Sequence, residues 1–152
     1  MELRQRINAA LKQAMRDKES ERLATLRLIN AAIRDREIAK RAEDGEDAVH
    51  EAEVLEILSK MVKQRRESVR AYEEAGRLDL AEAEQDEIAV IEEFLPRKLS
   101  EAEVEKAIDA AVAEVGASSI RDMGKVMGAL KARYTGQMDF GAVGAKVKAR
   151  LG

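Results

Sequence analysis

Apolar residues recur every three or four positions along most of the chain, which is the spacing of one face of an α-helix. The first such segment carries Leu3, Ile7, Leu11 and Met15. The second carries Leu23, Leu26, Ile29 and Ile33, and then continues as a polar segment to Lys40. The acidic stretch AEDGED at residues 42–47 has no apolar anchor and predicts a loop. No segment alternates apolar and polar residues with a period of two, so we expect no strands.

A third, longer segment has a seam of residues spaced alternately three and four apart. The seam consists of Leu55, Leu58, Val62, Arg65, Val69 and Tyr72. Gly76 suits the end of this helix, because glycine readily adopts the left-handed conformation that terminates many helices. The next segment carries Ala81, Ile88, Ile91 and Leu95, and Pro96 stops it.

Arg65 is the one charged residue in the apolar seam of the third segment. In an antiparallel hairpin it faces the fourth helix, whose stripe includes Glu84 between Ala81 and Ile88. We therefore predict a structural ion pair of Arg65 with Glu84 or Glu87. The alternative is an arginine that binds a partner.

The chain restarts after Pro96 with short helices. Ser100 and Glu103 form an S-x-x-E capping box, which is a reliable sign of a helix start. Gly116 ends that helix, and a second helix contains the stretch MGKVMGALK at residues 123–131. Asp139 suits the cap of a last helix, whose apolar stripe is Phe140, Val143, Val147 and Leu151.

We therefore predict an all-α protein with two domains. Residues 1–96 would form an N-terminal domain of four helices in antiparallel hairpins, and residues 97–152 a small C-terminal domain of three helices. The composition agrees with this fold class, since 45% of the residues are hydrophobic, 38% are charged and only 3% are aromatic.

The composition excludes several kinds of chemistry. The chain has no cysteine, which rules out disulfides, zinc–thiolate sites and thiol catalysis. His50 is the lone histidine and is expected to be a solvated residue at a helix start. The motif MGKVMG lacks the spacing and the preceding strand of a phosphate-binding loop. We predict no catalytic residue, no metal and no cofactor.

Neither a membrane anchor nor a secretory signal is expected. No run of about 18 apolar residues is present, which is the length that a membrane-spanning helix needs. The first residues, MELRQRINAALKQAM, are amphipathic and lack a cleavage site. We therefore expect a cytoplasmic protein with no membrane partner.

The net charge of −3 hides an uneven distribution. Residues 1–96 have a net charge of −6, whereas the segment from Ile120 onward has a net charge of +5. Such a density of basic residues on a small domain is typical of phosphate binding, although lysines also favour solubility and helix C-termini. The candidate nucleic-acid-binding residues are Lys125, Lys131, Arg133, Lys146 and Lys148.

Gly124 and Gly128 are one helical turn apart, on one face of the predicted helix. Each glycine in a helix interior costs about 1 kcal/mol relative to alanine, so the pair needs a reason. One explanation is a groove in which a neighbouring helix of the same domain crosses at close range. The other is close approach by an RNA backbone, which Lys125 would assist.

Three stretches together resemble the YqeY family of small bacterial proteins, which is similar to the C-terminal tail of GatB, a subunit of the tRNA-dependent amidotransferase. The most specific parts are KQRRES through EFLP, at residues 63–96, and MGKVMG with FGAVGAKVKARL downstream. The resemblance covers almost the whole chain. It implies a more basic loop at YTGQMDFGAV, where Gln137 and Met138 stand here.

The resemblance implies a helical N-terminal domain followed by a three-helix domain that recognises tRNA. The carbon–nitrogen ligase chemistry of the amidotransferase, with glutamine as nitrogen donor, belongs to other domains. The implied function is an accessory tRNA-binding module without a catalytic centre of its own, with an aminoacyl-tRNA synthetase or amidotransferase as a candidate protein partner. The alternative is a helical adaptor that binds such an enzyme through its acid-rich N-terminal helices.

Overall fold

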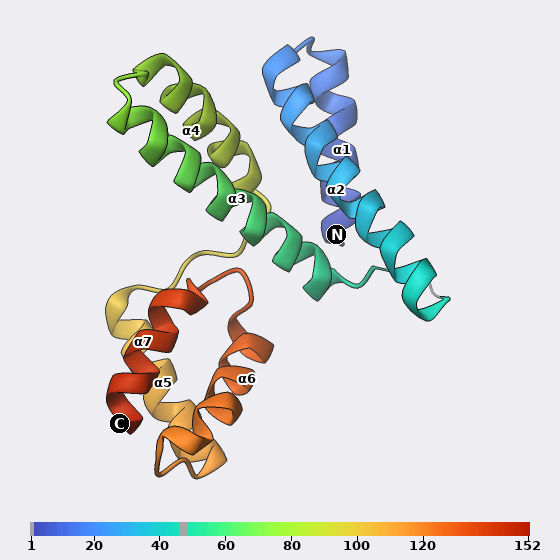
Figure 1. The fold of residues 1–152 in the computed structure, drawn as a ribbon. Helices are drawn as coiled ribbons and strands as arrows, with labels where there is room; N and C mark the ends of the chain where they lie inside the picture. The colour runs from blue at the N-terminus through green and yellow to red at the C-terminus, as the bar shows by residue number, and fades with distance from the viewer. Residues whose placement is uncertain (1, 46–48) are drawn as a thin grey trace. The chain divides into compact units, whose positions relative to one another are not determined.

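The structure, a computed structural model, describes residues 2–45 and 49–152 and is all-α, as predicted (Figure 1). The contacts divide it into two units, residues 1–95 and 96–152, which differ by one residue from the predicted division. Part of the predicted loop at residues 42–47 lies outside the described residues. Its first residues continue a helix that Gly45 ends in the left-handed conformation, with φ of 73°.

The first unit contains two helical hairpins. Helices α1 (Leu3–Arg16) and α2 (Ser20–Asp44) form one, and α3 (Glu51–Glu74) and α4 (Leu78–Glu92) form the other (Figure 1). Gly76 has φ of 75° and turns the chain between α3 and α4, as its sequence position predicted.

The core of the first unit follows the predicted stripes closely. Its most deeply buried side chains are Ile7, Leu26, Ile29, Ile33, Val54, Leu58 and Ile91. One prediction for α1 was wrong, because Ala14 is buried and Met15 is 54% exposed. The reason is that each step of four residues rotates the stripe by about 40° around the helix, so that Met15 is turned away from the core and Ala14 takes the buried position.

The second unit consists of α5 (Glu101–Val115), a short 3-10 helix η1 (Ile120–Asp122), α6 (Met123–Tyr134) and α7 (Phe140–Leu151). The predicted capping box is present, since the Ser100 hydroxyl accepts from the Glu103 amide at 3.2 Å and the Glu103 carboxylate accepts from the Ser100 amide at 3.0 Å. Asp139 caps α7, as predicted. The core of this unit comprises Val104, Ala107, Ile108, Ala111, Val126, Leu130, Met138, Val143 and Val147.

A buried ion pair that the helical periodicity does not reveal links α2 to α3. The side chain of Lys40 is only 9% exposed, and its Nζ lies 2.6 Å from a carboxylate oxygen of Glu53. Arg36 contacts the other oxygen at 3.3 Å. The hydrogen bond from Lys40, assisted by the backbone amide of His50 and by Arg36, lowers the pKa of Glu53 to about 2. His50 is exposed and lies just before α3, as expected.

The predicted ion pair in the α3 seam forms with Glu87. Arg65 Nε lies 3.5 Å from a carboxylate oxygen of Glu87, and an Arg65 guanidinium nitrogen donates to the carbonyl of Met61 at 3.2 Å. Glu84, the other predicted partner, does not lie within ion-pair distance of Arg65. Burial and the neighbouring Glu87 raise the pKa of Glu84. This cluster holds α3 against α4.

Candidate functional site

The exposed side of α6 is the most distinctive surface of the second unit. We call it the α6 outer face; it consists of Gly124, Lys125, Gly128, Lys131 and Ala132, all of which are exposed. The opposite side of the helix carries Val126 and Leu130, whose side chains are 0% and 1% exposed. The helix therefore turns its aliphatic residues inward, and this orientation places the glycines and lysines in solvent.

The prediction of a tight helix crossing at Gly124 and Gly128 was wrong. A Cβ atom built on either glycine would meet nothing within 4 Å. The close approach between α6 and α7 occurs at Gly144 instead, where a Cβ would lie 3.7 Å from the terminal carbons of Met123 and Met127. The flexible side chains of Met123 and Met127 therefore contact α7 at Gly144, whereas the space beside Gly124 and Gly128 is open.

The start of α6 is fixed by hydrogen bonds of Asp122. Its carboxylate accepts from the amide of Ser118 at 2.9 Å and from the amide of Ser119 at 3.3 Å. These two backbone hydrogen bonds, with a smaller contribution from the charge of Lys125, lower the pKa of Asp122. The α6 segment itself, MGKVMGALKARY, contains no acidic residue.

The candidate basic residues fall into two groups. Arg133 lies 2.6 Å from Glu114, and Lys146 lies 3.4 Å from Glu105; both acids belong to α5. Arg150 of α7 pairs with Asp109 of α5. The acidic side of α5 thus neutralises a basic residue of α6 and two of α7, in pairs that are about half exposed and individually weak.

The other group is Lys125, Lys131 and Lys148, which form no ion pair within the described part of the chain. Lys125 and Lys131 belong to the α6 outer face. On α7, Gly144 lies on the side that faces α6. Lys148 follows it by one helical turn and therefore lies on the same side of α7. Arg121, just before α6, is also exposed. The candidate lysines without an ion pair among the described residues therefore lie on α6 and α7, whereas Arg133 and Lys146 are paired with acids of α5.

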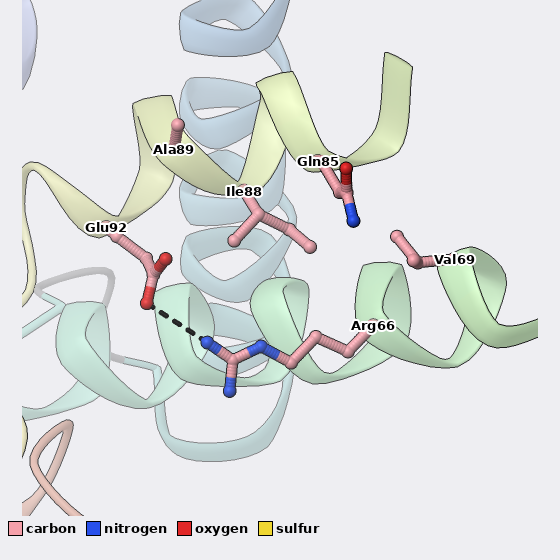
Figure 2. Close-up of a pocket in the computed structure, with 6 residues that line it drawn as sticks. All are labelled: Arg66, Val69, Gln85, Ile88, Ala89 and Glu92. Atoms are coloured by element: carbon pink, nitrogen blue, oxygen red, sulfur yellow. Dashed lines mark hydrogen bonds and ion pairs between the residues drawn. The ribbon is translucent and has the colours of Figure 1, made fainter. Parts of the chain in front are cut away.

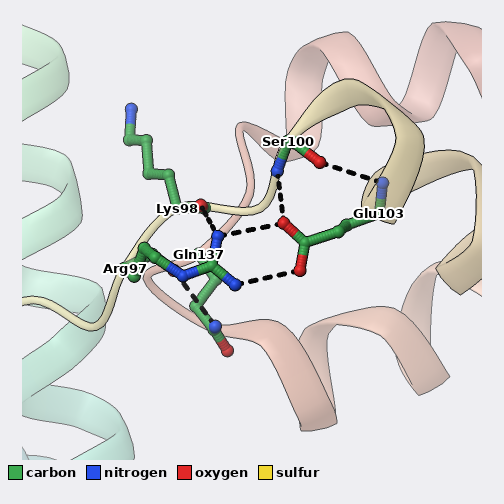
Figure 3. A network of polar contacts seen from close by, with 5 residues as sticks. All are labelled: Arg97, Lys98, Ser100, Glu103 and Gln137. Carbon is green, nitrogen blue, oxygen red and sulfur yellow. Dashed lines mark hydrogen bonds and ion pairs between the residues drawn. The ribbon is translucent and has the colours of Figure 1, made fainter.

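A polar network joins the start of the second unit to the loop between α6 and α7 (Figure 3). Arg97 contacts both carboxylate oxygens of Glu103 at 2.9 Å, and this interaction, with the Ser100 amide, lowers the pKa of Glu103 to about 2. The Gln137 side-chain amide donates to the Arg97 backbone carbonyl at 3.1 Å, and the Gln137 backbone carbonyl accepts from the Leu99 amide at 3.0 Å. Gln137 therefore has a structural role in the loop that the resemblance leads us to expect to be more basic. Met138 beside it is buried.

A shallow groove of about 320 Å³ lies between α3 and α4 (Figure 2). It is lined by Arg66, Val69, Gln85, Ile88, Ala89 and Glu92. Arg66 and Glu92 form an ion pair of 3.2 Å at one end of the groove. The lining contains no nucleophile paired with a base, so the groove offers no catalytic arrangement.

The described residues contain no cluster of three or more histidine, aspartate or glutamate side chains placed to hold a metal ion. Among their helices, none combines the length and apolarity that crossing a bilayer requires.

The fold and the exposed charges define a class: an all-α protein of two helical units whose second unit carries a basic, glycine-containing helix face. The sequence profile of the family described as Yqey-like protein matches residues 4–151. The chain therefore belongs to the YqeY family.

Curated relatives are found in yeasts. The protein called "Altered inheritance of mitochondria protein 41, mitochondrial" of Lachancea thermotolerans is 31% identical over 112 residues, which are 72% of this chain and 57% of the relative. Its namesake in Clavispora lusitaniae is 39% identical over 85 residues, 56% of this chain and 46% of the relative. An uncharacterized protein of Schizosaccharomyces pombe is 29% identical over 94 residues, 62% of this chain and 72% of the relative. The chain thus spans about half the length of the two longer relatives.

Proposed function

We propose that this chain is an accessory tRNA-binding module and that the α6 outer face contacts the RNA backbone. The observation that carries the proposal is the combination of Lys125 and Lys131, both exposed and unpaired within the described residues, with two glycines that have open space beside them. Lysines supply the sequence-independent attraction to phosphates, and the attraction depends on salt.

The two glycines would leave the backbone of α6 accessible to RNA. With no side chain at Gly124 and Gly128, a phosphodiester chain can approach the α6 backbone closely while Lys125 and Lys131 reach it from either side. Lys148 extends the same positive region onto α7. Recognition of this kind reads shape and phosphate spacing and carries no base code. Arg133 and Lys146 would contribute less, because each must first leave its acid on α5.

The module would work beside an enzyme that acts on tRNA, with an aminoacyl-tRNA synthetase or an amidotransferase as the protein partner. Any carbon–nitrogen ligase activity would belong to that partner, since no catalytic arrangement was found among the described residues. We propose the cytoplasm as its compartment. The printed names of the Lachancea and Clavispora relatives place those two proteins in mitochondria.

Filter binding of bulk tRNA at increasing salt tests the proposal. Three lysines at phosphates predict a slope of about −2 to −3 in a plot of log affinity against log salt, which is a loss of affinity of about 16- to 64-fold between roughly 50 and 200 mM. Purified single tRNA species are expected to bind with similar affinities. Failure to retain any tRNA at micromolar protein in 50 mM salt would overturn the proposal.

A further inference from the structure

Helix α2 has a second apolar stripe, opposite the one that faces the core. We call it the α2 outer stripe; it consists of Ala24, Leu28, Ala31, Asp35, Ile38 and Ala42, which are spaced alternately four and three apart and are all exposed. Leu28 and Ile38 are 44% and 57% exposed. A surface helix normally needs only one apolar stripe, so the second one is available to another helix.

Charged residues accompany this stripe in a defined arrangement. Arg27 and Arg34 are one heptad apart along one flank, both exposed, and neither forms an ion pair with a residue that the structure describes. Asp35 lies in the middle of the stripe and is equally without a partner there. A helix that covers the stripe would bring acidic residues to the arginine flank and one basic residue to Asp35.

A second copy of this chain fits the stripe poorly. In an antiparallel pair that packs Leu28 against Ile38, the two-fold axis falls near residue 33 and brings Arg34 next to its own copy. In a parallel pair, Asp35 lies opposite Asp35. Each arrangement places like charges together, which disfavours association.

We propose that the α2 outer stripe docks an amphipathic helix of a different protein, one with acidic residues along one flank and a basic residue at the level of Asp35. The stripe is about 27 Å long at 1.5 Å per residue, which matches a partner helix of five turns. The apolar layers supply affinity, whereas the arginine flank and Asp35 select the partner's charge and register. This surface belongs to the first unit and is independent of the proposed RNA contact.

Two fluorescein-labelled synthetic helices test the proposal against the full-length chain in anisotropy titrations. Both would carry leucine at the alternating seam positions and one lysine opposite Asp35; one would have glutamate along the flank and the other lysine. The glutamate peptide is expected to bind at least 10-fold more tightly than the lysine peptide. The double change Arg27→Glu with Arg34→Glu should invert this preference.

Matched variants distinguish binding at the α2 outer stripe from non-specific binding of the peptide elsewhere on the protein. Leu28→Ser with Ile38→Ser should weaken the glutamate peptide at least 10-fold. Met15→Ser with Leu78→Ser alters two other exposed apolar residues of the first unit, 54% and 67% exposed, and should leave affinity within 2-fold. Equal binding of the two peptides, no binding of either, or a dimer in sedimentation velocity that Leu28→Ser with Ile38→Ser abolishes would each overturn the proposal.

Discussion

Glu53→Gln is expected to lower the free energy of unfolding of the first unit by about 2 to 3 kcal/mol, because it leaves the Lys40 ammonium buried without a counter-charge. The substitution keeps a side chain that can still complete the cap of α3. Urea unfolding followed through Tyr72 in a Tyr134→Phe background would report this unit, since the chain has only two tyrosines. Adding Lys40→Met should recover much of the loss, because it removes the uncompensated charge.

The same pair gives stability a defined dependence on pH. The pKa of Glu53 is lowered to about 2 in the folded protein, against about 4.3 for an unperturbed glutamate. The unfolded chain therefore binds the proton first as pH falls, and the stabilisation, complete above about pH 5, is lost toward pH 2. Glu53→Gln should flatten the stability profile between these limits. An unchanged profile would contradict the assigned ion pair.

Gly124→Ala with Gly128→Ala is expected to stabilise the second unit by about 1 to 2 kcal/mol, because alanine is the better helix former and both added methyl groups would enter open space. The same variant should bind tRNA less tightly, because the methyl groups keep the RNA backbone away from α6. Unfolding would be followed through Tyr134 in a Tyr72→Phe background. Destabilisation would restore the tight-crossing explanation that the structure contradicts.

Gly144→Ala is the control for this pair of effects. It also adds a methyl group within a helix, and its Cβ would meet Met123 and Met127 at an ordinary contact distance of 3.7 Å. The position lies between α6 and α7 and outside the α6 outer face. Its RNA affinity should therefore match that of the wild type. The salt slope of the double alanine variant should also stay unchanged, because no charge is lost.

Local signals in the sequence predicted most of the helices. The capping box of Ser100 and Glu103, the stop at Gly76 and the cap at Asp139 each act within one turn, so the sequence near them determines the outcome. The buried stripes were predictable because each helix packs one face against its own unit. The prediction of a loop was wrong for residues 42–44, which continue α2. Residues without an apolar side chain against the core can still extend a long helix.

The contacts between helices were less accessible from sequence. Arg65 pairs with Glu87 and not with Glu84 because of the rotation of α4 about its own axis. The burial of Lys40 depends on the path of α3 beside α2. The helix crossing predicted at Gly124 and Gly128 was wrong, because their spacing places them on one face of α6 but does not show whether another helix packs against that face. Arg133 and Lys146 form ion pairs with acids of α5, whereas Lys131 forms none within the described residues, and this difference depends on how the helices pack.

The central claim, that the α6 outer face binds RNA, is tested most directly by charge reversal on that face. Lys125→Glu with Lys131→Glu should weaken tRNA binding at least 10-fold at 100 mM salt and reduce the salt slope by about 2. Lys98→Glu with Lys106→Glu makes the same change in net charge at two exposed lysines of the same unit outside this face and should leave affinity within about 3-fold. Equal losses in the two variants, or no loss in the first, would contradict the account.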